Sequence, residues 1–64
     1  MAAEVVDVTV QVLARTARAV LVTDGTPDEA VWVPLSQIEI EPSSRAGYHI
    51  VTLPAWLAME KGLL

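Results

Sequence analysis

The alternation of apolar and polar residues from Val6 to Val12 constrains the fold of this chain more than any other feature. Valines occupy every second position of the segment, and polar residues stand between them. Side chains two positions apart point to the same face of a β-strand, and valine favours extended backbone. The segment therefore predicts a strand at about residues 5–14, with one face in a core and the other toward water.

Length and composition limit the size and the oligomeric state of the domain that contains this strand. The chain has 64 residues and no cysteine, so it forms one small domain, 1–64, without disulfides. A domain of this size buries only about 60% of the surface that its unfolded chain exposes. Hydrophobic residues nevertheless make up 53% of the sequence, and the mean hydropathy is +0.47. Some apolar surface must remain exposed or meet another copy, so we expect a homo-oligomer.

The remaining elements follow from β-branched runs separated by turn residues. Proline has no backbone N–H, so Pro34 restricts its strand to an edge or a strand end. Pro54 suits the first helical position, and Gly62 suits the left-handed position after the last helical turn. The predicted strands cover about residues 5–14, 17–23, 30–35, 38–41 and 48–53, and the predicted helix covers about 54–61.

These elements predict a mainly β fold with one C-terminal helix. The sheet is expected to be a small antiparallel barrel of SH3-like or OB-like type, or else a strongly bent sheet. The continuous apolar run at 19–22 suggests a strand buried on both faces, either by the barrel wall or by a subunit contact. We also expect Leu63 to fold back onto Leu57 or Ala58, and Trp56 to anchor the helix to the sheet.

The net charge of −4 and the isoelectric point of about 4.5 argue against a nucleic-acid binder, because phosphate contacts need a basic face. The chain begins without a basic signal-peptide region, and no segment reaches the roughly 20 apolar residues of a membrane span. The lack of cysteine suits a reducing compartment. We therefore expect a cytoplasmic protein that does not contact a membrane.

No pattern in the chain predicts catalysis or metal binding. A nucleophile needs a base and an orienting group, and nothing links the single histidine, His49, to a particular serine. A zinc site needs three or four protein ligands. We expect a protein that is not an enzyme, with no catalytic residues, no metal and no cofactor.

Five residues are the candidates for ligand binding. Val31 and Val33 share one face of their strand, which leaves Trp32 outside the core. An exposed indole is covered by the helix, covered by another subunit, or free to stack on a ligand. Trp32 and Trp56 offer stacking, Arg18 offers a contact to phosphate, and Ser36 and Gln37 offer hydrogen bonds. These contacts would suit a small anionic ligand that carries a phosphate or a carboxylate. For Arg18, a surface or ion-pair role is the alternative.

Three segments carry a resemblance to a known family. Residues 19–22 read A-V-L-V, residues 31–38 read V-W-V-P-L-S-Q-I, and residues 53–63 read L-P-A-W-L-A-M-E-K-G-L. In order and rough spacing they resemble very small proteins encoded in tailed-phage and prophage genomes, with the motifs V-W-[IL]-P-x-S-Q-I and P-x-W-L-A-x-x-K-G-L. The resemblance spans nearly half of the chain. Leu35 departs from it, since a lysine is expected there, and this weakens a basic ligand contact at that corner.

The resemblance implies an origin rather than a mechanism. Small non-enzymatic phage proteins assist DNA metabolism, contribute to particles or block host defences. The resemblance therefore implies a phage-type binding module in the host cytoplasm, and specifically a host-defence inhibitor that sequesters a nucleotide signal at a subunit interface. Two alternatives remain open, which are a nucleic-acid-associated accessory or regulatory protein and a ligand-free assembly or scaffold protein.

Overall fold

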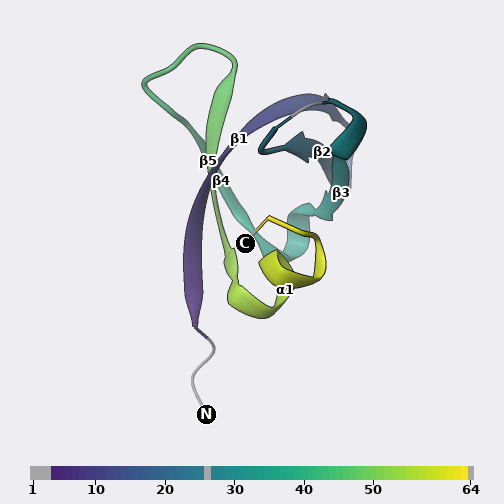
Figure 1. Ribbon diagram of the computed structural model, residues 1–64, viewed down its shortest axis with the longest axis vertical. Helices are drawn as coiled ribbons and strands as arrows, with labels where there is room; N and C mark the ends of the chain where they lie inside the picture. The colour runs from purple at the N-terminus through teal and green to yellow at the C-terminus, as the bar shows by residue number, and fades with distance from the viewer. Residues whose placement is uncertain (1–3, 26, 64) are drawn as a thin grey trace.

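The computed structural model describes residues 4–25 and 27–63 (Figure 1). Its mainly β architecture with a short C-terminal helix confirms the predicted fold class. Within the described residues, no helix has the length and apolar character needed to cross a membrane. The elements in chain order are β1 (Val5–Arg15), β2 (Ala19–Thr23), the 3-10 turn η1 (Pro27–Glu29), β3 (Val31–Pro34), the 3-10 turn η2 (Leu35–Gln37), β4 (Glu39–Pro42), β5 (Tyr48–Pro54) and α1 (Ala55–Glu60).

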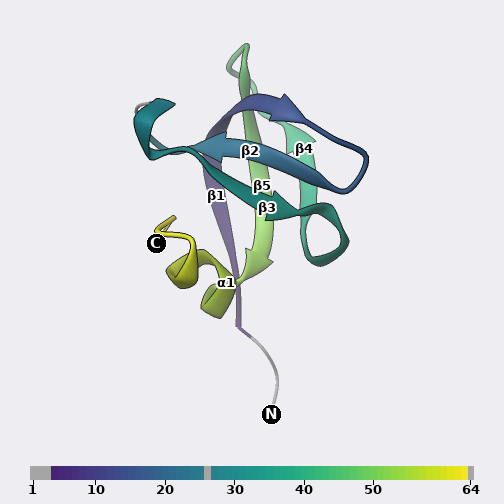
Figure 2. The same cartoon turned by 90° about the vertical axis from the view of Figure 1, so that its right-hand side faces the viewer.

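The strands form one antiparallel sheet in the order β3-β2-β1-β5-β4. The long strand β1 belongs to both halves, because its first part pairs with β5 and its last part pairs with β2. Figure 2 shows β2 and β3 running across the direction of β5. No pairing joins β3 to β4 in the described part of the chain, so the sheet is strongly bent rather than closed into a barrel.

A bulge helps β1 to bend between its two partners. Its register against β2 shifts between Val12 and Ala14, which leaves Leu13 as an extra residue. A bulge of this kind kinks a strand and increases its twist. The regular alternation of valines predicts the strand, but it gives no sign of the bulge that follows it.

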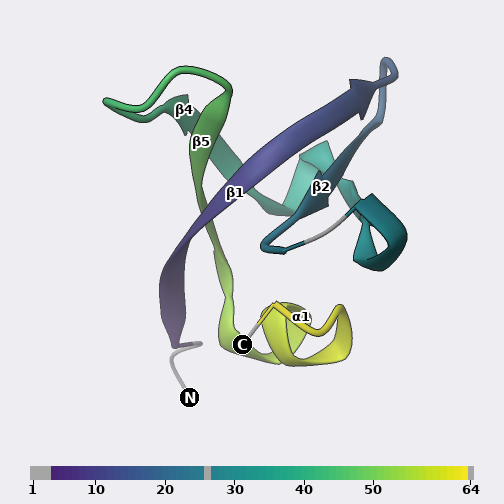
Figure 3. The ribbon, with the colours of Figure 1, turned by 45° about the horizontal axis from the view of Figure 1, so that its top comes forward.

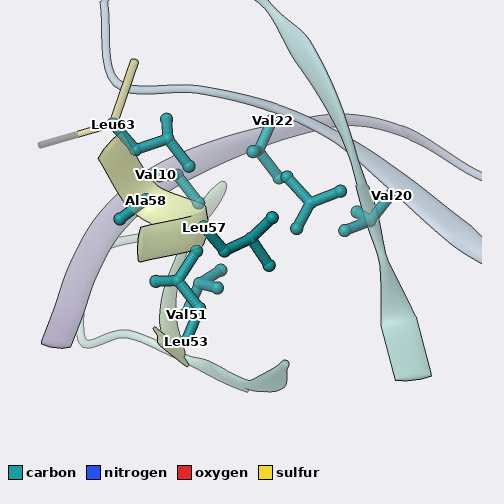
Figure 4. Close-up of a cluster of buried hydrophobic side chains, with 9 residues drawn as sticks. Val10, Val20, Val22, Val51, Leu53, Leu57, Ala58 and Leu63 are labelled. Atoms are coloured by element: carbon teal, nitrogen blue, oxygen red, sulfur yellow. The ribbon is translucent and has the colours of Figure 1, made fainter. Parts of the chain in front are cut away.

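The core lies on the concave side of the bent sheet, where α1 also sits (Figures 1 and 3). Alternate residues of β2 divide between the two faces, since Val20 and Val22 are fully buried while Ala19 and Leu21 are only partly buried. In the described part of the chain no other element covers the outer face of β2, so of the two ways in which the strand was expected to be buried on both faces, a subunit contact remains. The core consists of Val10, Val20, Val22, Val33, Val51, Leu53, Leu57, Ala58 and Leu63 (Figure 4).

A left-handed glycine ends α1 and returns the chain to the core. Gly62 has a φ of 74°, its N–H donates to the Met59 carbonyl at 3.2 Å, and the Leu63 N–H donates to the Ala58 carbonyl at 2.8 Å. These two bonds form the Schellman motif, and they bring Leu63 into the core as expected. Pro54 differs from its prediction. It is the last residue of β5 and, with φ −60° and ψ 141°, it precedes the helix instead of being its first residue.

Candidate functional site

A cleft of ≈ 320 Å³ opens between η2 and the end of β5, and we call it the corner cleft. It exists because β5 extends beyond β4. The first residue of β4, Glu39, pairs with Thr52, so the two residues that follow on β5 have no β4 neighbour. The residues that line the corner cleft are Val5, Ser36, Gln37, Ile38, Glu39, Thr52, Leu53 and Pro54.

The corner cleft has a polar side and an apolar side. The exposed side chains of Ser36 and Gln37 provide hydrogen-bond donors and acceptors. The Thr52 hydroxyl is engaged, because it donates to Asp7 Oδ1 at 2.6 Å. Among the described residues that line the cleft, Glu39 is the only charged one. The cleft therefore suits a neutral, donor-bearing group, such as the edge of a nucleobase, better than it suits a phosphate.

Two of the predicted ligand-binding residues line the corner cleft, and the backbone of a third lies beside η2. Ser36 and Gln37 line the cleft directly. Arg18 reaches the same corner from the β1–β2 turn, because its carbonyl accepts a hydrogen bond of 2.8 Å from the N–H of Leu35, the first residue of η2. The Arg18 side chain itself is exposed.

Trp32 lies outside the corner cleft, on the outer face of β3. Its indole is 45% exposed, whereas Val33 next to it is fully buried. Its direct partner on β2 is Leu21. Because α1 lies on the concave side, the helix does not cover Trp32 (Figure 3). Of the three environments expected for this indole, a second subunit and a ligand remain.

Trp56 does not anchor α1 to the sheet, which corrects the prediction made from the sequence. Its side chain is 54% exposed, while Leu57 and Ala58 are the helical residues that face the core. Trp56 and Met59 stand three positions apart, so they are neighbours on the exposed side of the helix. Trp56 follows Pro54 by two positions but is not among the residues that line the corner cleft.

Sequence reasoning missed the apolar wall of the corner cleft and two polar residues in it. Thr52 and Glu39 meet only through the register of β4 on β5. Val5 and Pro54 meet only through the register of β1 on β5. The outward position of Glu39 in a predicted strand was the only available signal.

Two further sources of information on this site are possible metal ligands and similar proteins. In the described residues, no group of three or more His, Cys, Asp or Glu side chains is placed to hold a metal. His49 is half-buried, and its Nδ1 atom has no hydrogen-bond partner among those residues. Comparison of the chain with protein-family models, curated proteins and solved structures gives no match in any of the three.

Proposed function

We propose that this chain is a non-enzymatic binding module of the phage type, which works as a homo-oligomer and sequesters a small nucleotide-like ligand. The observation that carries the proposal is a cleft of ≈ 320 Å³ that Ser36 and Gln37 line, with the backbone of Arg18 bonded to the first residue of the same turn, η2. These residues come from two separate segments of the sequence. Clefts of about this volume are typical of small-molecule sites.

The charged residues suggest that the base of the ligand binds inside the cleft and its phosphate outside it. The Glu39 carboxylate repels a phosphate but accepts hydrogen bonds from the N–H groups of a base. Ser36 and Gln37 complete the polar contacts to that base. The phosphate then lies outside the corner cleft, on the side of Arg18, whose guanidinium suits phosphate geometry.

A second copy would complete the site. The corner cleft is open to solvent, and none of the described residues that line it has an aromatic side chain on which a base can stack. Trp32 and Trp56 are both exposed, although their large apolar rings would normally be buried. A partner subunit that brings one of them to the cleft would supply the missing stacking surface.

Binding of nucleic acid has less support. The four basic residues are dispersed, since Arg15 and Arg18 lie at one turn, Arg45 lies over the Tyr48 ring at 4.5 Å, and Lys61 follows α1. A nucleic-acid groove needs a continuous basic stripe. The scaffold alternative requires self-association without any ligand, and the experiment below separates it from the proposal.

The test combines native mass spectrometry with ligand titration. The protein purified from bacterial cells is sprayed under native conditions to detect a retained small molecule, and nucleotides are then titrated by calorimetry. We expect Ser36→Ala with Gln37→Ala to abolish nucleotide binding without lowering the melting temperature. Ser44→Ala, an exposed change in the β4–β5 loop, is the control and should bind normally. If the protein retains no small molecule and binds no nucleotide at millimolar concentration, the proposal of a nucleotide-like ligand is wrong and the scaffold alternative remains.

A further inference from the structure

We infer that a second copy of this chain binds face to face on the outer side of β2 and β3, with the strands of the two copies antiparallel. The inference rests on the self-association proposed above and specifies its surface. Ala14, Leu21 and Trp32 form one row across β1, β2 and β3, and Ala19 and Pro34 form the next row. The residues of β2 and β3 in these rows alternate with buried valines, and Ala14 pairs with Leu21, so the five residues share the outer face, which we call the outer apolar face.

The first argument is that the free edge of β3 resists strand pairing. The Leu35 N–H donates to the Arg18 carbonyl at 2.8 Å, and hydrogen bonding alternates along an antiparallel ladder. Trp32 and Pro34 therefore direct their backbone nitrogen and oxygen atoms away from β2, toward the open edge. Pro34 has no N–H to offer there.

The free edge of β4 is built in the same way. The Ser43 N–H donates to the Tyr48 carbonyl at 3.2 Å, so Ile40 and Pro42 direct their backbone atoms away from β5. Pro42 again stands where a donor would face an incoming strand. Prolines at such positions protect sheet edges from edge-to-edge association. Within the sheet, the faces are therefore better suited to self-association than the edges.

The second argument selects the part of the outer face. In a two-fold dimer each patch meets its own copy. The outer side of β1, β5 and β4 carries Asp7, Glu39 and Glu41, so this part would bring acidic groups against acidic groups. The outer apolar face has no charged side chain in its two rows and exposes 45% of Trp32. It is the part of the outer face that a second copy can cover without repulsion.

The third argument fixes the orientation. Arg15 and Arg18 lie at the β1–β2 turn, whereas Asp24, Asp28 and Glu29 lie at the opposite end of β2, in the connection to β3. A two-fold axis that runs across the strands places the basic end of one copy over the acidic end of the other. An axis along the strands would place like charges together. Charge complementarity therefore favours the antiparallel dimer.

The first test compares two exposed apolar side chains, Trp32 and Met59, by analytical ultracentrifugation of the full chain. We expect Trp32→Ala to raise the dimer dissociation constant by at least about 30-fold, as for an interface hot spot. Met59→Ala, on the exposed side of α1, is the control and should change the dissociation constant less than about 3-fold, and circular dichroism verifies that both variants fold. If the dissociation constant does not change in Trp32→Ala, the outer apolar face is not the contact surface, although the protein still self-associates. A wild-type protein that stays monomeric at millimolar concentration would overturn both the proposed contact surface and self-association itself. The nucleotide titration tests ligand binding independently of either result.

The second test addresses the orientation. Arg15→Glu with Arg18→Glu places acids over acids in the antiparallel dimer, and Asp28→Lys with Glu29→Lys places bases over bases, so each double variant should dimerise more weakly. An equal mixture of the two double variants has complementary ends on both sides and should regain wild-type affinity at low salt. Double variants that dimerise as tightly as the wild type would overturn the antiparallel arrangement, because an axis along the strands places like charges together in the wild type already. A mixture that associates no more tightly than either variant alone would overturn it as well.

Discussion

The Thr52 hydroxyl donates a hydrogen bond to Asp7 Oδ1 at 2.6 Å, and so connects two residues that lie 45 positions apart in the sequence. The two residues are direct partners in the register of β1 on β5, and Glu39 is the partner of Thr52 on the other side. Thr52 thus stands between two carboxylates and gives its single proton to one of them. The bond fixes a wall of the corner cleft to the long strand β1.

Replacing Thr52 by valine tests what this bond contributes. The change keeps the shape of the side chain but removes the donor to a charged acceptor, so we expect the free energy of unfolding to fall by about 1 kcal/mol. Urea denaturation followed by circular dichroism measures it. Thr9→Val, in the next row of the same face, is the control and should stay within about 0.5 kcal/mol of the wild type. Equal stabilities of the two variants would show that the bond adds nothing.

The two sides of α1 predict opposite effects of truncation to alanine. Leu57 is 3% exposed and belongs to the core, so Leu57→Ala should cost about 2–5 kcal/mol, enough to unfold much of a domain this small. Met59 is 68% exposed, and Met59→Ala should leave stability nearly unchanged. Thermal denaturation of both variants measures the difference. A Leu57→Ala protein that melts like the wild type would contradict the role of α1 in closing the core.

Gly62 provides a purely backbone prediction. No heavy atom lies within 4 Å of the position of an added Cβ, so Gly62→Ala would cause no clash, and its cost would come from the φ of 74°. A left-handed conformation costs an L-residue about 1–2 kcal/mol. Chemical synthesis with D-alanine at position 62 is the control, since a positive φ is natural for a D-residue and stability should be retained. If both substitutions destabilise equally, the left-handed backbone is not the cause.

Much of the fold can be predicted from the sequence because its signals are local. The alternation of valines predicts β1, and the pair Pro54 and Gly62 brackets α1 to within one residue at its start. The bulge at Leu13 and the use of β1 by both halves of the sheet depend on long-range pairing, which no local pattern shows. For the same reason, the sequence could not decide between a closed barrel and a bent sheet.

The candidate site was less predictable for a related reason. Ser36 and Gln37 follow a proline-ended strand, and such a polar corner is visible in the sequence. The cleft beside them depends on where β4 stops pairing with β5, which is a question of register. The exposure of Trp56 depends on which side of a six-residue helix faces the core, and one short helix gives too few apolar positions to decide this.

The edge prolines lead to a final prediction about aggregation. Pro42→Val restores an N–H that points away from β5, and so offers an incoming strand the donor that the native edge lacks. We expect this variant to form β-rich aggregates at concentrations where the wild type does not, as measured by light scattering and thioflavin fluorescence. Glu41→Val is the matched control, because it adds the same side chain to the same strand while its N–H already faces β5. If Glu41→Val aggregates as readily as Pro42→Val, added apolar surface and lost charge are responsible, and the missing donor is not what protects the edge.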